Sequence, residues 1–463
     1  MYIDFAMNKW ITNKSQNLDM LNGNLIVNLI KYAIPLALTG ILQQVFNAAD
    51  VAVVGNFAGE EAMSAVGSNS PVIGLLVNLF VGISLSANVV IAHASGQQNY
   101  ERIEKAVHTS ILVSIFGGIL IATIGEIFAK PIVSAMDVPE EISDMALTYL
   151  RIYILGLPVI FLYNFESAIF RSRGNTKIPL VALVISGIIN VFLNLLFVCV
   201  FKMDVDGVAW ATVISNLISS SVLFVFLLKT DDKIKVSIRK LKIDFEVLSK
   251  MLKIGIPSGL QGMVFSLSNI IVQSAINSLG TTVISASTAA FNLEIFSFYV
   301  MNSFGQSCTT FVGQNFGARK NDRCRKILFT CLLLCFISTG TTCGLILLFG
   351  RNLLSIFNKN PEVISIGLVR LQVIFFAYLF SFAQENFSGY LRGFGVSAVP
   401  AISTLIGVCG TRLIWIFFVF KANPKFETIM QVYPISLGIT AVFLIGFTLI
   451  MRPSKRFSGK GDL

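Results

Sequence analysis

A chain of 463 residues with 54% hydrophobic and only 13% charged residues is too apolar for a water-soluble protein, whose domains carry roughly 25% charged residues. The net charge of +10 would favour a nucleic-acid partner for a soluble protein. Here the basic residues stand in short runs between apolar segments. We therefore expect them to orient the protein in the membrane, and we expect no nucleic-acid binding. The composition therefore predicts an all-α integral membrane protein.

Twelve segments are apolar over the roughly 20 residues that a helix needs to cross a bilayer. In the first half of the chain they are residues 27–54, 66–93, 106–128, 146–170, 178–201 and 207–229. In the second half they are residues 249–278, 283–313, 326–349, 368–391, 398–420 and 431–451. Because backbone polar groups in lipid must be satisfied internally, each segment is predicted to be a transmembrane helix.

The distribution of basic residues predicts that both chain ends lie in the cytoplasm. With this orientation only six of the 35 basic residues fall in external loops, and four more lie at or within helix ends. The external loops are acidic instead, with Glu60, Glu61, Asp137, Glu140, Glu141, Asp204 and Asp206. This bias follows the positive-inside rule, and short loops favour a bacterial inner membrane.

The longest hydrophilic stretch, residues 229–253, divides the chain into two halves. We expect a cytoplasmic tail over 1–24, an N-lobe over 25–229, a linker over 230–248, a C-lobe over 249–451 and a tail over 452–463. The pattern around Phe245 and Leu248 would allow a short surface helix in the linker. Residues 1–24 do not have the pattern of a cleavable signal peptide.

The two halves are an internal repeat. Lys31-Tyr-Ala-Ile-Pro35 recurs as Lys253-Ile-Gly-Ile-Pro257, and at an offset of 221 Arg102, Lys105 and Gly174 meet Arg323, Lys326 and Gly395. Each copy holds six helices, so both copies have the same orientation, as in parallel-repeat transporters. We therefore expect two pseudo-symmetric six-helix bundles. Pro35 and Pro257 interrupt corresponding helices and are predicted hinges.

Acidic residues inside apolar spans are costly and are functional candidates by default. Asp50 is the sharpest, because Gln43, Asn47 and Asp50 share one face of the first helix and Asn190 and Asn194 share one face of the fifth. Two polar faces should meet each other or a wet cavity. The set is predicted to bind a proton or a small hard cation such as Na⁺; the alternative is a hydrogen-bonded packing cluster without a ligand.

Four further acids lie in apolar spans. Glu294 stands among aromatic residues that include Phe291, a setting suited to a lipophilic cation, or else it pairs with an Arg or Asn of a neighbouring helix. Glu166 and Glu385 are weaker substrate-binding candidates, because each lies within two turns of an arginine. Asn269, which corresponds to Asn47 in the repeat, is a further substrate-binding candidate. Glu126 lies near an external helix end, where it would reach water.

Signatures of other functions are absent from the sequence. There is no Walker loop, no His-Glu-x-x-His motif and no serine-nucleophile elbow, so we expect neither ATP hydrolysis nor another enzyme activity, and no cofactor. Seven cysteines without a Cys-x-x-Cys pair predict neither a disulfide framework nor a zinc site.

Several ordered segments resemble the multidrug and toxic compound extrusion (MATE) transporters over about residues 25–450. The similar segments are the first helix from Ile34 to Asp50, Ile169-Phe-Arg-Ser-Arg-Gly-Asn-Thr-Lys-Ile-Pro179, Val205-Asp-Gly-Val-Ala-Trp-Ala-Thr212 and Phe311-Val-Gly-Gln-Asn-Phe-Gly-Ala318. The resemblance implies a drug–cation antiporter with two lobes around a central cavity. It also implies that Asp50, with Asn190 near it, belongs to an N-lobe cation site.

Two positions depart from the family pattern. Some members carry a second acid where this chain has Asn194, and some carry a glutamate on the seventh helix where it has Phe265. The second departure argues against the C-lobe sodium arrangement of those members.

We expect export of amphipathic, often cationic, drugs by a monomer in exchange for inward H⁺ or Na⁺, with alternating access between the lobes. A first alternative is a flippase for a lipid-linked sugar. Its anionic cargo would favour a cavity lined by arginines, whereas the membrane-embedded charges are mainly acidic. A remote alternative is a membrane-embedded enzyme or receptor.

Overall fold

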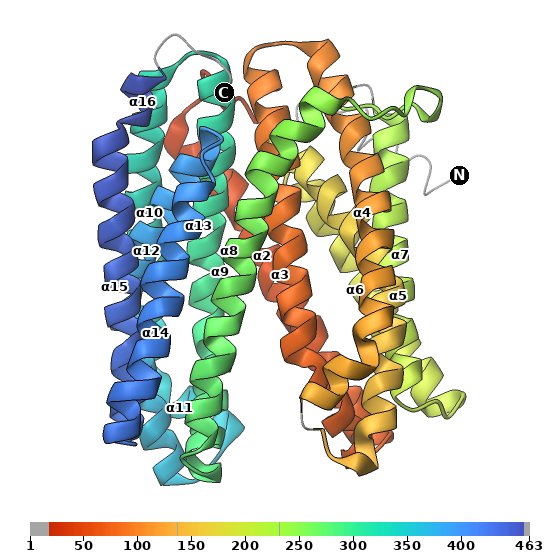
Figure 1. Ribbon diagram of the computed structural model, residues 1–463, viewed down its shortest axis with the longest axis vertical. Coiled ribbons are helices and arrows are strands. Elements are labelled where there is room, and N and C mark those ends of the chain that lie inside the picture. Colours follow the sequence, from red (N-terminus) through yellow and green to blue (C-terminus); the bar gives the residue numbers. More distant parts are fainter. Residues whose placement is uncertain (1–17, 137, 231, 458–463) are drawn as a thin grey trace. The chain divides into compact units, whose positions relative to one another are not determined.

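The computed structural model describes residues 18–136, 138–230 and 232–457, and within these ranges the chain is helical and has no strand (Figure 1). Twelve of the described helices are long and apolar enough to cross a bilayer, which confirms the predicted number. The six spanning helices of the first repeat are α2 (Leu25–Phe57), α3 (Glu60–Gly96), α4 (Tyr100–Ala135), α5 (Glu140–Ser172), α6 (Lys177–Leu195) and α7 (Val205–Lys229).

The second repeat has the same order of helices. It consists of α8 (Phe245–Asn277), α9 (Thr281–Gly317), α10 (Asn321–Leu348), α12 (Pro361–Gly393), a helix divided into α13 (Ala398–Thr404) and α14 (Thr411–Ile414), and α15 (Phe426–Met451). Two short helices, α11 (Gly350–Phe357) and α16 (Pro453–Arg456), also belong to this half of the chain. The linker before α8 contains the short helix η3 (Ile238–Lys240). Three π-helical segments, η2 (Leu196–Val200), η4 (Leu405–Gly410) and η5 (Trp415–Phe420), interrupt the fifth and eleventh spans.

Most spanning helices extend several residues beyond the predicted apolar segments, because polar residues carry their ends out of the hydrocarbon. Asn99, for example, caps α4 by accepting a hydrogen bond from the backbone N–H of Arg102. The pattern around Phe245 and Leu248 does not form a separate surface helix; it is the first turn of α8. Helix α11 was not predicted, since its eight residues are too few for a spanning segment.

The chain divides into two compact units, whose limits differ from the predicted lobes. The first unit contains residues 38–252 and the second contains residues 19–37 and 253–463, apart from the residues not described. The start of α2 therefore belongs with the second unit, and the linker with the first. Within the linker, Ser237 donates its backbone N–H to Nε2 of the buried His108, and Lys240 pairs with Glu104.

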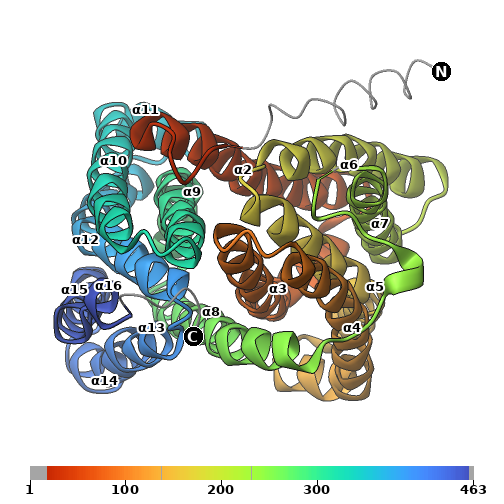
Figure 2. The ribbon, with the colours of Figure 1, turned by 90° about the horizontal axis from the view of Figure 1, so that it is seen from above.

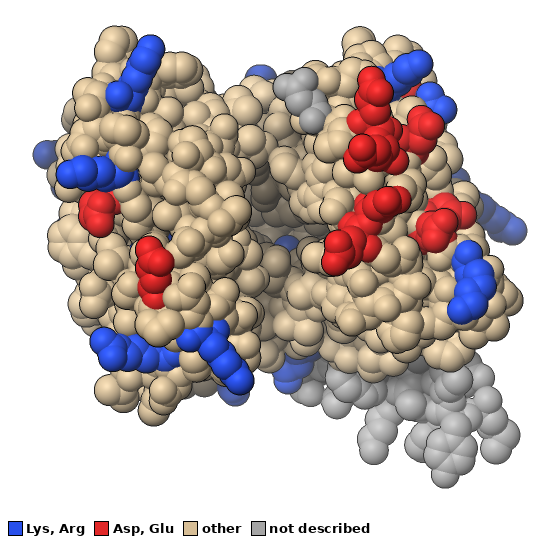
Figure 3. Space-filling model, turned by 90° about the horizontal axis from the view of Figure 1, so that it is seen from below, with Lys and Arg blue, Asp and Glu red and all other residues tan. Residues whose placement is uncertain are grey.

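The first unit packs α5 against α3, α4 and α7, with α6 on α7 (Figure 2). Phe161 of α5 stacks on Phe80 of α3 with ring centroids 4.5 Å apart. The loop end of this unit carries exposed carboxylates, which Figure 3 shows on the lower face of the molecule; they are Glu60, Glu61, Glu140, Glu141, Asp144 and Asp204.

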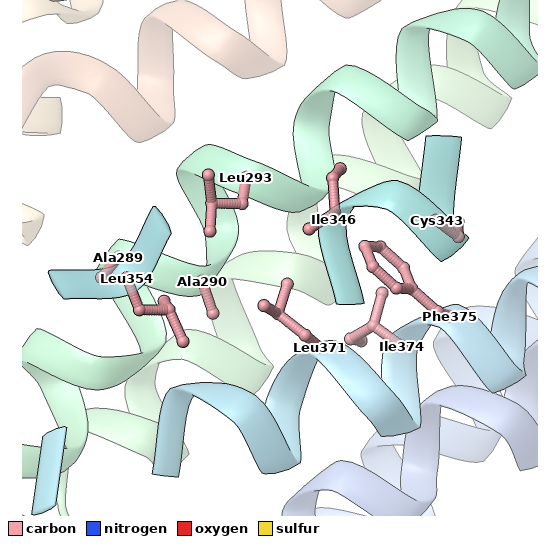
Figure 4. Packing of buried hydrophobic residues seen from close by; sticks show 9 residues of the cluster. All are labelled: Ala289, Ala290, Leu293, Cys343, Ile346, Leu354, Leu371, Ile374 and Phe375. Carbon is pink, nitrogen blue, oxygen red and sulfur yellow. The ribbon is translucent and has the colours of Figure 1, made fainter. Parts of the chain in front are cut away.

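The second unit packs α9 against α10 and α12, and α12 against α15. Its core at one end is a cluster of α9, α10, α11 and α12 side chains centred on Leu371 (Figure 4). Small residues bring α9 and α12 into close contact: a Cβ on Gly389 would collide with the backbone carbonyl oxygen of Gly305. The residues 19–37 are held in this unit by Asn315, whose Nδ2 donates to the carbonyl of Met20, and by a hydrogen bond between Tyr32 and Thr310.

The backbone repeats as faithfully as the sequence. Positive φ angles occur at Gly59 and Gly280, at Gln98 and Arg319, and at Gly174 and Gly395. The members of each pair lie 221 residues apart, and the φ angles of Gly174 and Gly395 are 85° and 83°. Because these turns end corresponding helices with the same left-handed geometry, the two repeats share one fold.

Candidate cation site

Asp50 lies in the second half of α2 and is held by side chains from two other helices of the first unit. Its Oδ1 accepts a hydrogen bond from Nδ2 of Asn194 on α6 at 2.5 Å. Its Oδ2 accepts one from Oγ1 of Thr212 on α7 at 3.2 Å. Nδ2 of Asn194 also lies 3.4 Å from Oδ1 of Asn190, one helical turn away. The structure therefore brings Asp50, Asn190 and Asn194 together, as the sequence predicts.

The carboxylate is almost completely enclosed, with 8% of the residue exposed. Tyr149 and Tyr153 of α5 stack beside it, close enough for electrostatic interaction with the Asp50 charge. Among the described residues, no lysine or arginine lies within ion-pair distance of Asp50. A buried charge without an opposite charge is expensive, so this acid gains stability by binding a cation or a proton.

The donor set suits a proton or a hard cation. Asp50 and Thr212 offer oxygens directly, and the carbonyl oxygens of Asn190 and Asn194 lie in the same cluster. The Oδ1 atom of Asn194 is buried and has no hydrogen-bond partner. Na⁺ prefers such oxygen ligands, and a protonated carboxyl would need one acceptor for its O–H. The described residues contain no group of three or more His, Cys, Asp or Glu side chains that would hold a transition metal.

Thr212 was not predicted as part of this site. A threonine in an apolar helix usually returns its hydroxyl bond to the preceding turn, and Oγ1 of Thr212 also donates to the carbonyl of Val208 at 3.0 Å. Its only distinguishing signal in the sequence is its place at the end of the Val205–Thr212 segment. The π-helical segment η2 begins two residues after Asn194. Segments of this kind often mark functional sites.

Gln43 and Asn47 were predicted to share the site, and the structure does not bring them to it. Both side chains are exposed, and neither has a hydrogen bond to Asp50, Asn190 or Asn194. Gln43 lies about two helical turns before Asp50 and Asn47 about one turn before it, so both point the same way as Asp50 but at other depths along α2. Their part in cation coupling stays a prediction.

Glu294 of α9 does not stand alone among aromatic rings. Arg370 of α12 binds both its carboxylate oxygens, with Nη2 at 2.7 Å from Oε1 and Nε at 3.1 Å from Oε2. Nη1 of Arg370 donates to Oγ of Ser287 at 2.6 Å. This bidentate pair is buried, and it matches the alternative of a partner on a neighbouring helix. A carboxylate already neutralised in this way has little charge left for a lipophilic cation; Phe291, nearby, is partly exposed.

A second buried arginine was not predicted. Arg412 of α14 is 1% exposed, and its Nη1 donates to Oδ1 of Asn269 at 2.6 Å. Its guanidinium lies 4.9 Å from the ring centroid of Tyr433 and 5.6 Å from that of Phe265, the residue that replaces an acid of other family members. In the described part of the chain, no carboxylate pairs with Arg412. Arg412 is one of the four basic residues predicted to lie at or within helix ends, and the structure places it inside the eleventh span, between η4 and η5.

The remaining acids each have neighbours within their own unit. Glu166 of α5 is fully buried, and its Oε2 accepts a hydrogen bond from Ser220 at 2.8 Å. Glu385 of α12 lies against the backbone of Gly305 and in electrostatic range of Arg392, whose Nη2 donates to Gln261. Glu126 lies 3.7 Å from Arg151. Glu166 lies in the first unit, and Glu294 and Glu385 lie in the second.

The predicted hinges lie close to the limits of the compact units. Pro35 precedes the division of α2 after Ala37, and Pro257 follows the division of the chain after Leu252. The structure describes one arrangement, so the hinge role stays a prediction.

The sequence and the fold are similar to those of known proteins. The MatE family model matches residues 35–196 and again residues 257–418, which are the two repeats. The probable multidrug resistance protein YoeA of Bacillus subtilis is 29% identical over 440 residues, covering 92% of this chain and 94% of that protein. The probable multidrug resistance protein NorM of Thermotoga maritima is 25% identical and covers 85% of each chain. A crystal structure of a MATE in complex with MaL6 has a TM-score of 0.88 at 20% identity, covering 96% of this chain and 100% of that one.

Proposed function

Because the chain belongs to the MatE family, we propose that it is a secondary active exporter that expels amphipathic, often cationic, compounds in exchange for H⁺ or Na⁺. It is a transporter rather than an enzyme. We place it as a monomer in a bacterial inner membrane with both ends in the cytoplasm, in line with the positive-inside bias of its loops.

One observation carries this proposal: Asp50 is buried in a membrane-spanning unit with amide and hydroxyl partners and, among the described residues, no basic one. The multidrug names of the relatives supply the cargo class, since YoeA and NorM are each described as a probable multidrug resistance protein. The carboxylate supplies the coupling, because loading it with an ion removes a buried charge and changes which conformation is favoured. Cationic drug and coupling ion then oppose each other's binding.

The test is efflux of ethidium from vesicles that contain the purified protein, with H⁺ and Na⁺ gradients imposed separately and without ATP. Wild-type protein should transport ethidium against its gradient under at least one ion gradient. Asp50→Asn, which keeps the size of the side chain and one of its two acceptor oxygens, should lose coupled efflux and keep its folding. Glu126→Gln is the matched control, because it removes another acid of a spanning helix that does not contact Asp50.

Equal transport with no ion gradient would contradict coupling. Full coupled efflux by Asp50→Asn would remove Asp50 from the mechanism while leaving the exporter assignment intact. Loss of efflux in Glu126→Gln to the same extent would show that any acid of a spanning helix is needed, and would deprive Asp50 of its special role.

Arg412 favours a second candidate, transport of an amphipath with an anionic headgroup, such as a lipid-linked sugar. In the second unit Arg370 neutralises Glu294, so the buried group of charges around Tyr433 has a net positive charge. The sequence predicts mainly acidic charges within the membrane, and this prediction disfavours a flippase. The net positive charge around Tyr433 is the opposite of that prediction. An anionic group would find in Arg412 a fork of donors that is held in part by the amide oxygen of Asn269.

Two fluorescent amphipaths with identical tails, one with a quaternary ammonium and one with a phosphate headgroup, separate the candidates. The exporter of cations should transport the ammonium probe and should keep doing so in Arg412→Gln. A flippase for anionic cargo should transport the phosphate probe and lose it in the same variant. Arg412→Lys, which retains the charge, controls for instability of the buried site.

A further inference from the structure

A groove of about 900 Å³ lies in the second unit between the start of α2 and the start of α10, and we call it the α2–α10 groove. Its polar wall carries Arg323, Arg325 and Lys326, and its apolar wall includes Ile26 and Phe329. One acid, Asp322, also lines it, so the groove has a net positive charge. No part of the proposed cation site contributes to this groove.

The three cations of the groove differ in how far other groups of the protein engage them. Nη2 of Arg323 donates to the carbonyl oxygen of Gly23 at 2.6 Å, which fixes the start of α2 against α10. The guanidinium of Arg325 lies 5.7 Å from the ring centroid of Phe329. Arg325 and Lys326 are exposed, and within the described residues neither pairs with a carboxylate. Two positive charges at this groove are therefore open to an external anion.

The first repeat provides an internal comparison. Arg102 and Lys105 occupy the positions 221 residues before Arg323 and Lys326, at the start of α4. There the chain supplies the anions itself: Arg102 pairs with Glu246 at 3.4 Å, and Lys105 pairs with Asp244 at 3.7 Å.

The difference lies in the segment that begins the neighbouring helix. At the start of α8 this segment carries Asp244 and Glu246, whereas at the start of α2 it reads Asn22-Gly-Asn-Leu25 and has no acid. Asp19, just before it, uses its carboxylate to accept the backbone N–H groups of Leu21 and Asn22. The second repeat thus keeps the basic positions Arg102 and Lys105 as Arg323 and Lys326, has Arg325 in place of Glu104, and omits the carboxylates at the start of the neighbouring helix.

Below the groove, apolar side chains continue along both helices. On α10, Phe329, Leu333, Phe336 and Ile337 each expose half or more of their surface and follow the spacing i, i+4, i+7 and i+8 of one helix face. On α2, Ile26 and Ile34 also expose about half of their surface, and Ile30 between them exposes 37%. From Phe329 to Ile337 the face extends about 12 Å along the helix axis, which is close to the depth of one leaflet of hydrocarbon.

We propose that the α2–α10 groove binds an anionic phospholipid, with the headgroup phosphate at Arg325 and Lys326 and the acyl chains along the exposed faces of α2 and α10. Lysine and arginine near a bilayer surface attract anionic lipids, and basic pockets between transmembrane helices hold their headgroups. A soluble anion would use the same two cations but would gain nothing from the apolar faces. Those faces therefore select the lipid as the source of the phosphate.

Native mass spectrometry of the full-length protein, incubated with equal amounts of phosphatidylglycerol and phosphatidylcholine, tests this proposal. Wild-type protein should retain phosphatidylglycerol in preference. Arg325→Gln/Lys326→Gln should reduce its retention by about tenfold or more, because two charge-assisted contacts are lost. The control, Arg102→Gln/Lys105→Gln, removes two cations from the start of the corresponding helix of the first repeat. It should leave retention unchanged, since the chain's own acids occupy those cations.

Equal retention of the two lipids by wild-type protein would overturn the proposal, and so would wild-type retention by the Arg325→Gln/Lys326→Gln protein. Displacement of phosphatidylglycerol by millimolar inorganic phosphate would overturn it in favour of a soluble anion. Because the readout is lipid binding rather than efflux, these outcomes do not depend on the proposed transport function.

Discussion

Asn194 donates its side-chain amide to Oδ1 of Asp50 across 2.5 Å, from a position 144 residues further along the chain. The contact joins α2 to α6 inside the first unit, and Thr212 of α7 closes the other side of the carboxylate. Three helices thus meet at one acid, so an ion that binds there changes the contacts among all three. The second unit has Val272 at the position 222 residues after Asp50, and therefore has no equivalent acid on its first helix.

Asn194→Ala should lower the proton concentration for half-maximal H⁺-driven efflux by about tenfold or more, because the lost amide N–H stabilises the ionised, unloaded carboxylate of Asp50 by about 1.5–3 kcal/mol. Thr212→Val should have a smaller effect of about threefold, since its bond is longer and its hydroxyl is shared with Val208. Ethidium efflux at graded ion concentrations measures both. Gln43→Ala should behave as wild type, because the exposed Gln43 does not contact Asp50; an effect as large as that of Asn194→Ala would contradict the described site.

Glu294→Gln should destabilise the protein by about 3–5 kcal/mol, because it leaves Arg370 as an unpaired buried charge. Replacing both residues, as in Glu294→Gln/Arg370→Met, should recover most of this loss. The thermal unfolding midpoint of the purified protein in detergent measures the difference. If the single variant is as stable as wild type but binds cationic drugs poorly, the ion pair is not structural and Glu294 regains its role as a substrate-binding residue.

Gly389→Ala should destabilise the contact between α9 and α12 by about 1–3 kcal/mol, because the new methyl group meets the carbonyl oxygen of Gly305. Gly344→Ala on α10 is the matched control. A Cβ at Gly344 meets nothing within 4 Å, so the substitution should leave stability unchanged or raise it by up to about 1 kcal/mol. Equal unfolding midpoints for the two variants would show that α9 and α12 do not pack as described.

Asp244 caps the start of α8, and it makes stability depend on pH. The backbone N–H of Val247 bonds its carboxylate at 3.0 Å and lowers the pKa of Asp244, with a further contribution from the charge of Lys105. Because the pKa is lower in the folded state, the cap stabilises the protein above the ordinary aspartate pKa of about 4 and loses this effect as pH falls through the lowered value.

Asp244→Ala should therefore cost about 1 kcal/mol at neutral pH and much less in strong acid, as measured by unfolding midpoints across pH. Asp244→Asn should retain most of the cap at every pH, since asparagine caps helices as well as aspartate. An Asp244→Ala loss that stays the same down to pH 2 would exclude the ionised cap as its cause.

Hydropathy alone was enough to predict the twelve helices, because each must present about 20 apolar residues to lipid whatever it packs against. The pairing of Asp50 with Asn190 and Asn194 was predictable for a related reason: polar faces on apolar helices have few other places to go. Thr212 was missed, since a hydroxyl that can return to its own helix is not costly in lipid and leaves no pattern.

The second unit shows what sequence patterns cannot supply. Glu294 and Arg370 lie 76 residues apart, and their pairing depends on how α9 crosses α12. The contacts of Arg412 with Asn269 and Tyr433 likewise depend on how the eleventh span packs against α8 and α15. Helical spacing places Gln43 and Asn47 on the same face of α2 as Asp50, but it does not give a contact, and neither exposed side chain makes a hydrogen bond to Asp50.

Helix α2 is one continuous rod, yet the compact units divide it after Ala37, two residues beyond Pro35. Any displacement of one unit must therefore be transmitted through this rod or absorbed by bending it. Proline has no N–H to donate to the preceding turn, so the rod is weakest next to the point at which it changes unit. The start of α2 is held in the second unit through Met20 and Tyr32, so we expect α2 to bend near Pro35 when the rest of the helix moves with the first unit.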